Sequence, residues 1–77
     1  MKKLLKFLVE KITGNKDFEI QDSEEEGRVD YMILAPEEIV GMIIGKGGKT
    51  IKTIRNLLKV RATLDKKAVS VSVAPKA

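Results

Sequence analysis

Apolar and polar residues follow three different spacings along the chain, and each change of spacing marks an expected element. Residues 2–13 combine lysines with apolar side chains three and four positions apart, which is the period of an amphipathic helix. Gly14 and Asn15 follow, and such a pair is typical of a helix C-terminus. The chain therefore predicts a helix over residues 2–13, with one apolar stripe formed by Leu4, Leu5, Leu8, Val9 and Ile12.

A two-residue alternation then replaces the helical period over residues 17–35. Phe18 and Ile20 are two apart, as are Val29, Tyr31 and Ile33, and the polar run DSEEEG separates the two groups. This pattern predicts a β-hairpin over residues 17–35 in which DSEEEG forms the turn. The second strand also carries Met32 and Leu34, so we expect it to be the more deeply buried, with Phe18 and Tyr31 facing the core.

The helical period returns after Pro36, which suits the start of a helix with two glutamates in its first turn. We expect a short helix over residues 36–44 and a second over residues 48–60. The second has an apolar side and a cationic side; the former comprises Ile51, Ile54, Leu57 and Leu58, and the latter Lys49, Lys52, Arg55, Asn56 and Lys59. Alternating valines and serines predict a final strand over residues 68–74.

This order of elements predicts an α+β fold with the sequence α-β-β-α-α-β. Two helices connect the strand of Tyr31 to the strand of Val71, so these strands should run parallel in one sheet. The expected architecture is a three-stranded mixed sheet with the helices packed on one face. A chain of 77 residues has room for one modest core, so we expect a single domain over residues 1–77.

Composition removes most enzymatic chemistry. The chain contains no cysteine and no histidine, which excludes disulfides, Cys/His zinc sites, thiol nucleophiles and imidazole acid-base catalysis. We expect no enzymatic activity, no cofactor and no metal. Lys6 and Glu10 interrupt the N-terminal apolar run that would otherwise imitate a secretion signal, and no apolar stretch is long enough to span a membrane. The expected location is the cytoplasm.

Charge is unevenly distributed along the chain. Residues 1–38 carry six basic and ten acidic side chains, whereas residues 39–77 carry nine basic side chains and only Asp65 as an acid. The overall net charge of +4 therefore conceals a strongly cationic second half. Such a split is typical of proteins that bind a polyanion, although a solvated lysine surface has the same composition.

The stretch IIGKGGKTI, residues 43–51, places three glycines and two lysines between two expected helices. The first amides of the second helix lack intrahelical partners, and glycines let an anion approach them closely. The ending Gly48-Lys49-Thr50 also matches a nucleotide-binding P-loop. That motif needs a glycine where Ile43 stands and a preceding strand instead of a helix, so we disfavour it. A turn that only connects two helices needs one glycine, so three glycines with flanking lysines favour a binding function.

The same stretch resembles the I-G-x-x-G-x-x-I signature of KH domains, whose GXXG loop clamps nucleic-acid backbone. Two strands before the loop and one after resemble the type II arrangement. In length and in VGMIIGKGGKTIKTIR, the chain is similar to the small bacterial single-KH RNA-binding proteins of the KhpA type. This resemblance implies a site for single-stranded RNA formed by the loop Gly45, Lys46, Gly47 and Gly48, the groove wall Val40, Gly41 and Ile44, and the cationic residues Lys49, Lys52 and Arg55.

The resemblance also implies partners, since such proteins are understood to form homodimers and to associate with a larger KH-containing RNA-binding protein. The corresponding roles are post-transcriptional regulation or RNA chaperoning, with a protein-interaction adaptor that binds little RNA as the alternative. Gly47 departs from the polar or basic residue common at its position, so loop contacts should rely on backbone amides. Phe7 lies off the apolar stripe, and we expect it to be an exposed contact for self-association.

Overall fold

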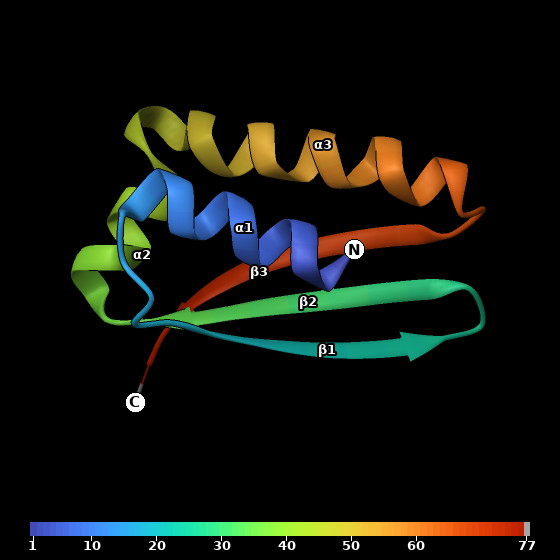
Figure 1. Cartoon of the computed structure of the whole chain (residues 1–77), viewed down its shortest axis with the longest axis horizontal. Coiled ribbons are helices and arrows are strands. Elements are labelled where there is room, and N and C mark those ends of the chain that lie inside the picture. The colour runs from blue at the N-terminus through green and yellow to red at the C-terminus, as the bar shows by residue number, and fades with distance from the viewer. Residues whose placement is uncertain (77) are drawn as a thin grey trace.

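The computed structural model describes residues 1–76, and its elements follow the predicted order. Figure 1 shows helix α1 (Lys2–Thr13), strands β1 (Glu19–Glu25) and β2 (Arg28–Ala35), and helix α2 (Glu37–Ile44). A 3-10 turn (Lys46–Gly48), helix α3 (Lys49–Leu64) and strand β3 (Ala68–Pro75) complete the fold. The predicted α+β class of type II KH-like order is therefore confirmed.

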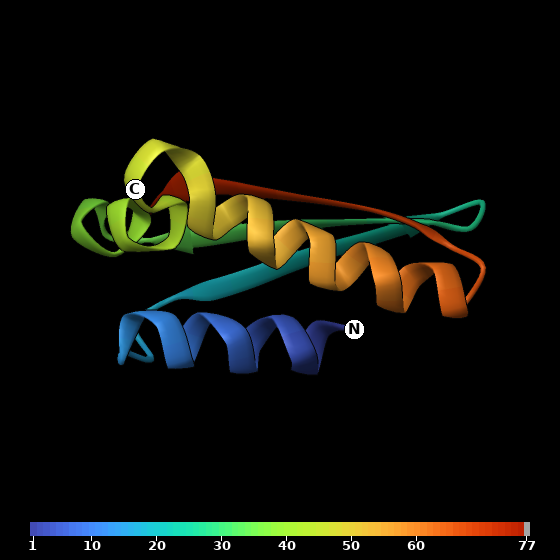
Figure 2. The ribbon, with the colours of Figure 1, turned by 90° about the horizontal axis from the view of Figure 1, so that it is seen from above.

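The three strands form one mixed sheet in the order β1-β2-β3. Strand β2 pairs antiparallel with β1 and parallel with β3, so that Tyr31 lies between Asp22 and Val71. All three helices lie on one face of this sheet (Figures 1 and 2). The parallel pairing of the strands of Tyr31 and Val71 is as predicted, because the α2–α3 segment forms the connection between them.

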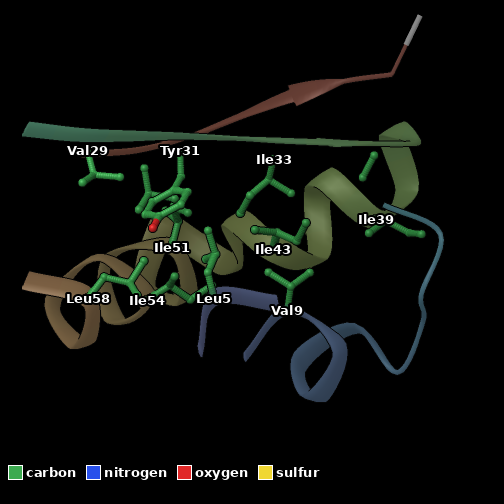
Figure 3. Packing of buried hydrophobic residues seen from close by; sticks show 12 residues of the cluster. Leu5, Val9, Val29, Tyr31, Ile33, Ile39, Ile43, Ile51, Ile54 and Leu58 are labelled. Atoms are coloured by element: carbon green, nitrogen blue, oxygen red, sulfur yellow. The ribbon is translucent and has the colours of Figure 1, made fainter. Parts of the chain in front are cut away.

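The hydrophobic core fills the space between the helices and the central strand. Figure 3 shows side chains from β2 meeting side chains from α1, α2 and α3 in one cluster. Along β2, Val29, Tyr31 and Ile33 point into this core, while the residues between them face the open side of the sheet. Strand β1 has no fully buried residue, so β2 is the more deeply buried strand, as predicted.

Helix α1 contacts the core along a narrower line than its sequence predicts. Leu5, Val9 and Thr13 are buried, whereas Leu4 and Ile12 of the predicted stripe are exposed. Thr13 is tolerated in the core because its hydroxyl donates a hydrogen bond of 2.8 Å to the carbonyl of Val9. The other flank of the stripe stays in solvent, and Phe7 is 54% exposed, as expected.

The hairpin turn is much shorter than predicted. DSEEEG was expected to form the turn, but β1 continues through Glu25, and only Glu26 and Gly27 reverse the chain. Both have positive φ, 46° and 79°, as a two-residue type I′ hairpin turn requires. Phe18 was expected within the strand; it precedes β1 and packs half-buried against the core.

Helix α3 begins where expected, but it ends at Leu64, four residues beyond the predicted span of residues 48–60. No glycine or proline interrupts residues 49–64, so the helix continues and adds Ala62 to its buried side. Leu57 was assigned to that side and is instead 46% exposed. In the part of the chain that the structure describes, none of the helices combines the length and apolarity that crossing a bilayer requires.

Candidate nucleic-acid interface

Helix α2 leads the chain into the glycine-rich loop and orients one wall of the candidate site. Pro36 occupies the N-cap, and Ile39 and Ile43 anchor the helix in the core. Because these anchors are four residues apart, Gly41 and Ile44 remain on an exposed flank, with Ile44 38% exposed. Val40 lies half-buried between this flank and the core.

Three positive φ angles shape the loop itself. Gly45, Gly47 and Gly48 have φ of 76°, 66° and 74°, a conformation that residues with a side chain rarely adopt. At Gly45 the space is also taken, since a Cβ atom there would lie 2.2 Å from the hydroxyl oxygen of Thr50. Gly47 and Gly48 meet nothing within 4 Å, so the outer side of the loop is open to a ligand.

The loop leaves the N-terminus of α3 without a side-chain cap. The amide of Gly45 donates to the carbonyl of Gly41 at 2.9 Å, and the amide of Gly48 donates to the carbonyl of Gly45 at 3.1 Å. No side chain caps α3, and no acidic residue lies in its first turn. The positive end of the helix dipole therefore lacks an internal anion, which makes it a favourable place for an external one.

A cationic flank of α3 continues the site toward strand β3. Lys49 and Lys52 are exposed, and the guanidinium Nε of Arg55 donates a hydrogen bond of 3.1 Å to the carbonyl of Val71. This bond places Arg55 against the outer edge of the sheet. A shallow cavity of about 340 Å³ lies there, lined by Arg55, Lys59 and residues 69–72 of β3.

The cavity adds two features that the predicted site did not contain. Lys59 was recognised as part of the cationic side of the helix and not as a site residue, and the edge of β3 was not considered at all. The backbone amides of Ala68 and Lys76 donate inward, to the carbonyls of Gly27 and Ala35, so odd-numbered residues such as Val71 direct their backbone groups outward. The Val-Ser alternation was the only available signal for this edge.

Five of the ten other cations of the protein form ion pairs. Exposed carboxylates neutralise them in the pairs Lys2–Asp22, Arg28–Asp30, Arg61–Asp65, Lys67–Glu24 and Lys76 with Asp17 and Glu19. The hydrogen bond to Glu24 raises the pKa of Lys67 above its ordinary value. Within residues 1–76, no ion pair involves Lys46, Lys49, Lys52, Arg55 or Lys59. The loop and one flank of α3 thus carry five cations without an ion pair. Elsewhere in residues 1–76, Lys3, Lys6, Lys11, Lys16 and Lys66 are likewise outside the ion pairs.

All ten predicted site residues lie on α2, the loop or the first two turns of α3. Val40, Gly45 and Gly48 are half-buried, and the other seven are exposed. The fold therefore brings a hydrophobic wall, an open glycine loop and a row of cations into one continuous surface. Which of these residues contact a ligand remains a prediction.

Comparison with known proteins gives a consistent result over almost the whole chain. The family model described as KhpA/KhpB, KH domain, matches residues 2–73. A protein of Thermotoga maritima named RNA-binding protein KhpA is 35% identical over 74 residues, which cover 95% of this chain and 97% of the relative. A protein of the same name from Clostridium acetobutylicum is 34% identical over 76 residues, covering 95% of this chain and 99% of the relative.

Proposed function

Because the chain belongs to the KhpA/KhpB KH-domain family, we propose that it binds single-stranded RNA through the Gly45–Gly48 loop. Both relatives are named as RNA-binding proteins, and neither name denotes an enzyme. The observation that carries the proposal is the row of cations without an ion pair, from Lys46 to Lys59, that begins at the N-terminus of α3, which has no side-chain cap. Both features favour a phosphate at the same place.

In this proposal the loop holds the sugar-phosphate backbone. One phosphate lies at the positive end of the α3 dipole, with Lys46 and Lys49 supplying charge on either side. Gly47 provides no side chain, so its contribution is close approach of backbone to backbone. Lys52 and Arg55 contact the next phosphates along α3, and the bases lie against the exposed aliphatic surface of Ile44 and Gly41.

The distribution of aromatic residues favours a site of low sequence specificity and modest affinity. Phe18 packs against the core, Tyr31 is buried, and Phe7 lies on α1, so none of the three lines the proposed groove. Stacking on aromatic side chains contributes about 1–3 kcal/mol per base in other single-strand binders. Without it, most of the binding free energy comes from phosphate contacts and depends strongly on salt.

Filter binding to a single-stranded RNA oligonucleotide at two salt concentrations tests this function. We expect saturable binding that weakens with salt and is stronger than binding to a duplex of the same sequence, since a duplex cannot turn its bases toward Ile44. A double-stranded RNA bound equally well would indicate general attraction to polyanions. Absence of binding to any RNA at low salt would contradict the proposal and favour an adaptor role.

Weak binding by one site also suggests that the protein acts in pairs. We propose that it functions as a homodimer, or with a larger KH-containing RNA-binding protein, as a post-transcriptional regulator or RNA chaperone in the cytoplasm. Linking two weak sites raises the effective affinity for an RNA that reaches both. The exposed apolar side chains on α1 and α3 support this part of the proposal and are the observation that favours an adaptor function as well.

A further inference from the structure

Helix α1 has an outer side, facing away from the core, that the site described above does not use. Lys3, Phe7 and Lys11 are each four residues apart, so they form one line along the helix, opposite the buried line of Leu5 and Val9. Phe7 is 54% exposed, and Nζ of Lys11 lies 5.5 Å from the centroid of its ring. We call Lys3, Phe7 and Lys11 the α1 ridge.

The lysines near the start of α1 are not explained by the helix itself. Lys2 and Lys3 occupy the first turn, at the positive end of the helix dipole, and no acidic residue offsets them in that turn. Lys2 forms an ion pair with Asp22, whereas Lys3 and Lys6 form none within residues 1–76. The dipole favours a cation only in the last turn, where Lys11 stands. An external anion along α1 would account for the lysines that the dipole disfavours.

A hollow of about 420 Å³ lies beside Phe7 at the C-terminal end of α1. Its lining residues are Phe7, Glu10, Lys11, Gly14, Asn15 and Lys16. Lys11 and Lys16 supply two cations, neither in an ion pair within residues 1–76, against the single carboxylate of Glu10. An exposed aromatic ring next to a cationic hollow suits a nucleotide, because the base stacks on the ring and the phosphate pairs with a lysine.

The C-terminal end of α1 lies at the same end of the molecule as the glycine loop. Figures 1 and 2 both show α2 and the start of α3 at this end. Helix α2 packs against α1 as well as against α3. An RNA strand that occupies the loop can therefore reach Phe7 by passing over α2, without crossing the sheet.

The surroundings of Phe7 favour RNA over a second copy of this chain or a membrane. A symmetric antiparallel pair centred on Phe7 would bring Lys3 of one copy to Lys11 of the other, and like charges across an interface oppose pairing. A membrane surface takes the apolar side of an amphipathic helix, but Leu5 and Val9 of that side are fully buried in the core. The expected role of Phe7 in self-association is therefore the less favourable one.

We propose that the α1 ridge is a second contact for single-stranded RNA, in which one base stacks on Phe7 and the adjoining phosphates lie at Lys3 and Lys11. This inference rests on the RNA-binding function proposed above and adds an aromatic contact that the glycine loop lacks. The attraction between an exposed lysine and an aromatic ring is weak, so the base takes the place of Lys11 on Phe7, and Lys11 turns to the phosphate. A strand that engages both the loop and α1 is held at two places and binds more tightly than one that reaches the loop alone.

NMR titration with two lengths of single-stranded RNA tests the second contact. One RNA has about four nucleotides and fills the glycine loop, and the other is several times as long. Phe7→Ala should weaken binding of the long RNA by about tenfold and leave binding of the short RNA within about twofold of the parent. Phe7→Tyr keeps the aromatic ring and should bind both RNAs like the parent. In the parent, the long RNA should shift the ring resonances of Phe7, as a stacked base does, and the short RNA should not.

Charge variants separate a phosphate contact on α1 from general attraction to the protein. Lys11→Gln should flatten the slope of log affinity against log salt for the long RNA by roughly 0.7. Lys66→Gln is the matched control and should keep the slope of the parent. Lys66 is also outside the ion pairs of residues 1–76, but it lies at the other end of α3 from the glycine loop. Equal slope changes for the two variants would overturn the phosphate contact on α1.

Failure of the second contact can be told apart from failure of the proposed function. If the short RNA binds the parent and Phe7→Ala binds the long RNA equally well, the inference fails and the glycine loop stands as the RNA site. If neither RNA binds the parent, the proposed function fails and the inference with it.

Two further measurements distinguish RNA from the other occupants of the α1 ridge. Sedimentation of Phe7→Ala should give the mass of the parent; a lower mass together with weaker RNA binding would assign Phe7 to self-association and overturn the inference. Vesicles that contain phosphatidylserine should bind neither protein. Binding of the vesicles to the parent and not to Phe7→Ala would assign the α1 ridge to a membrane surface and likewise overturn it.

Discussion

Two tight turns of this protein use residues with positive φ for different purposes. Glu26 and Gly27 take positive φ angles to join β1 to β2, and Gly45, Gly47 and Gly48 do so to join α2 to α3. In the hairpin, strand pairing resumes at once with Glu25 opposite Arg28, so the turn serves chain reversal. In the loop, the following helix begins without a side-chain cap, and no acidic residue lies in its first turn.

The two turns also differ in whether the charged side chains beside them have partners. Two carboxylates near the hairpin turn are held by partners: Asp30 accepts from Ser70 and Arg28, which lowers the pKa of its carboxyl group, and Glu24 accepts from Lys67. The lysines at the glycine loop have no ion-pair partner among residues 1–76. A turn becomes a candidate site because its neighbours are left unsatisfied, and glycine content alone does not decide it.

The largest expected effect comes from reversing the charge of the glycine loop. Replacing Lys46 and Gly47 together by Asp places two carboxylates where we place a phosphate, so affinity for single-stranded RNA should fall by roughly 100-fold or more. Stability should fall by about 1 kcal/mol, because Gly47 needs a positive φ but has open space around it. Filter binding with circular dichroism as a folding check measures both.

If the folded double variant still bound RNA like the parent, the loop would not be the phosphate site. The glycine loop and the hairpin turn would then not differ in RNA binding, although the fold would be unaffected.

The next largest effect is on stability and comes from the close approach of Gly45 to Thr50. Gly45→Ala introduces a Cβ that meets the Thr50 side chain at 2.2 and 2.6 Å, in addition to the strain of its φ, and should cost about 2–3 kcal/mol of unfolding free energy. Gly48→Ala has a similar φ and no clash, so it should cost only about 1 kcal/mol. Urea unfolding of the two variants isolates the steric part, and equal losses would mean that the approach of Gly45 to Thr50 is unimportant.

A smaller effect on stability is expected at the hairpin turn, with no effect on RNA binding. Gly27→Ala should cost about 1 kcal/mol because of the φ of 79°, whereas Gly27→Asn should cost less, since asparagine tolerates this region. Both variants should bind single-stranded RNA with the affinity of the parent. An RNA-binding defect in a fully folded Gly27 variant would show that the two turns are not functionally separate.

The smallest effect tests whether unpaired and paired cations differ. Lys52→Ala should weaken binding a few-fold for every RNA sequence and flatten the slope of log affinity against log salt by roughly 0.7. Lys67→Ala removes a cation that Glu24 already neutralises, so the slope should stay unchanged. Equal slope changes for the two variants would indicate a diffuse attraction spread over the whole surface.

Much of the fold could be predicted because the period of apolar residues changes wherever the structure changes. The errors fell where local pattern and tertiary context differ. Charged residues in β1 suggested a turn, since an edge strand with one solvated face needs few apolar residues. Leu57 matched the apolar side of α3 by sequence, yet the sheet covers a narrower arc that passes through Leu58 and Ala62.

Only part of the candidate site could be predicted from the sequence, for a related reason. Local sequence identifies the loop, because glycines and lysines must stand together to form it. The contact of Arg55 with Val71 depends on packing between segments 16 residues apart, and no local pattern encodes it. For the same reason, the sequence could not show which cations would be neutralised, since Lys67 meets Glu24 across 43 residues.

The parallel pairing of β2 with β3 also sets the order in which the candidate site can be assembled. Each β2 residue finds its β3 partner 40 residues later, as in the pair Asp30 and Ser70, and α2, the loop and α3 all lie between them. Closing so long a loop is entropically costly and slow relative to forming the hairpin or a helix. During synthesis the glycine loop leaves the ribosome on the order of seconds before β3 does. A growing chain therefore has its phosphate loop before it has the β3 wall of the groove, and the complete surface forms only when residues 68–75 join the sheet.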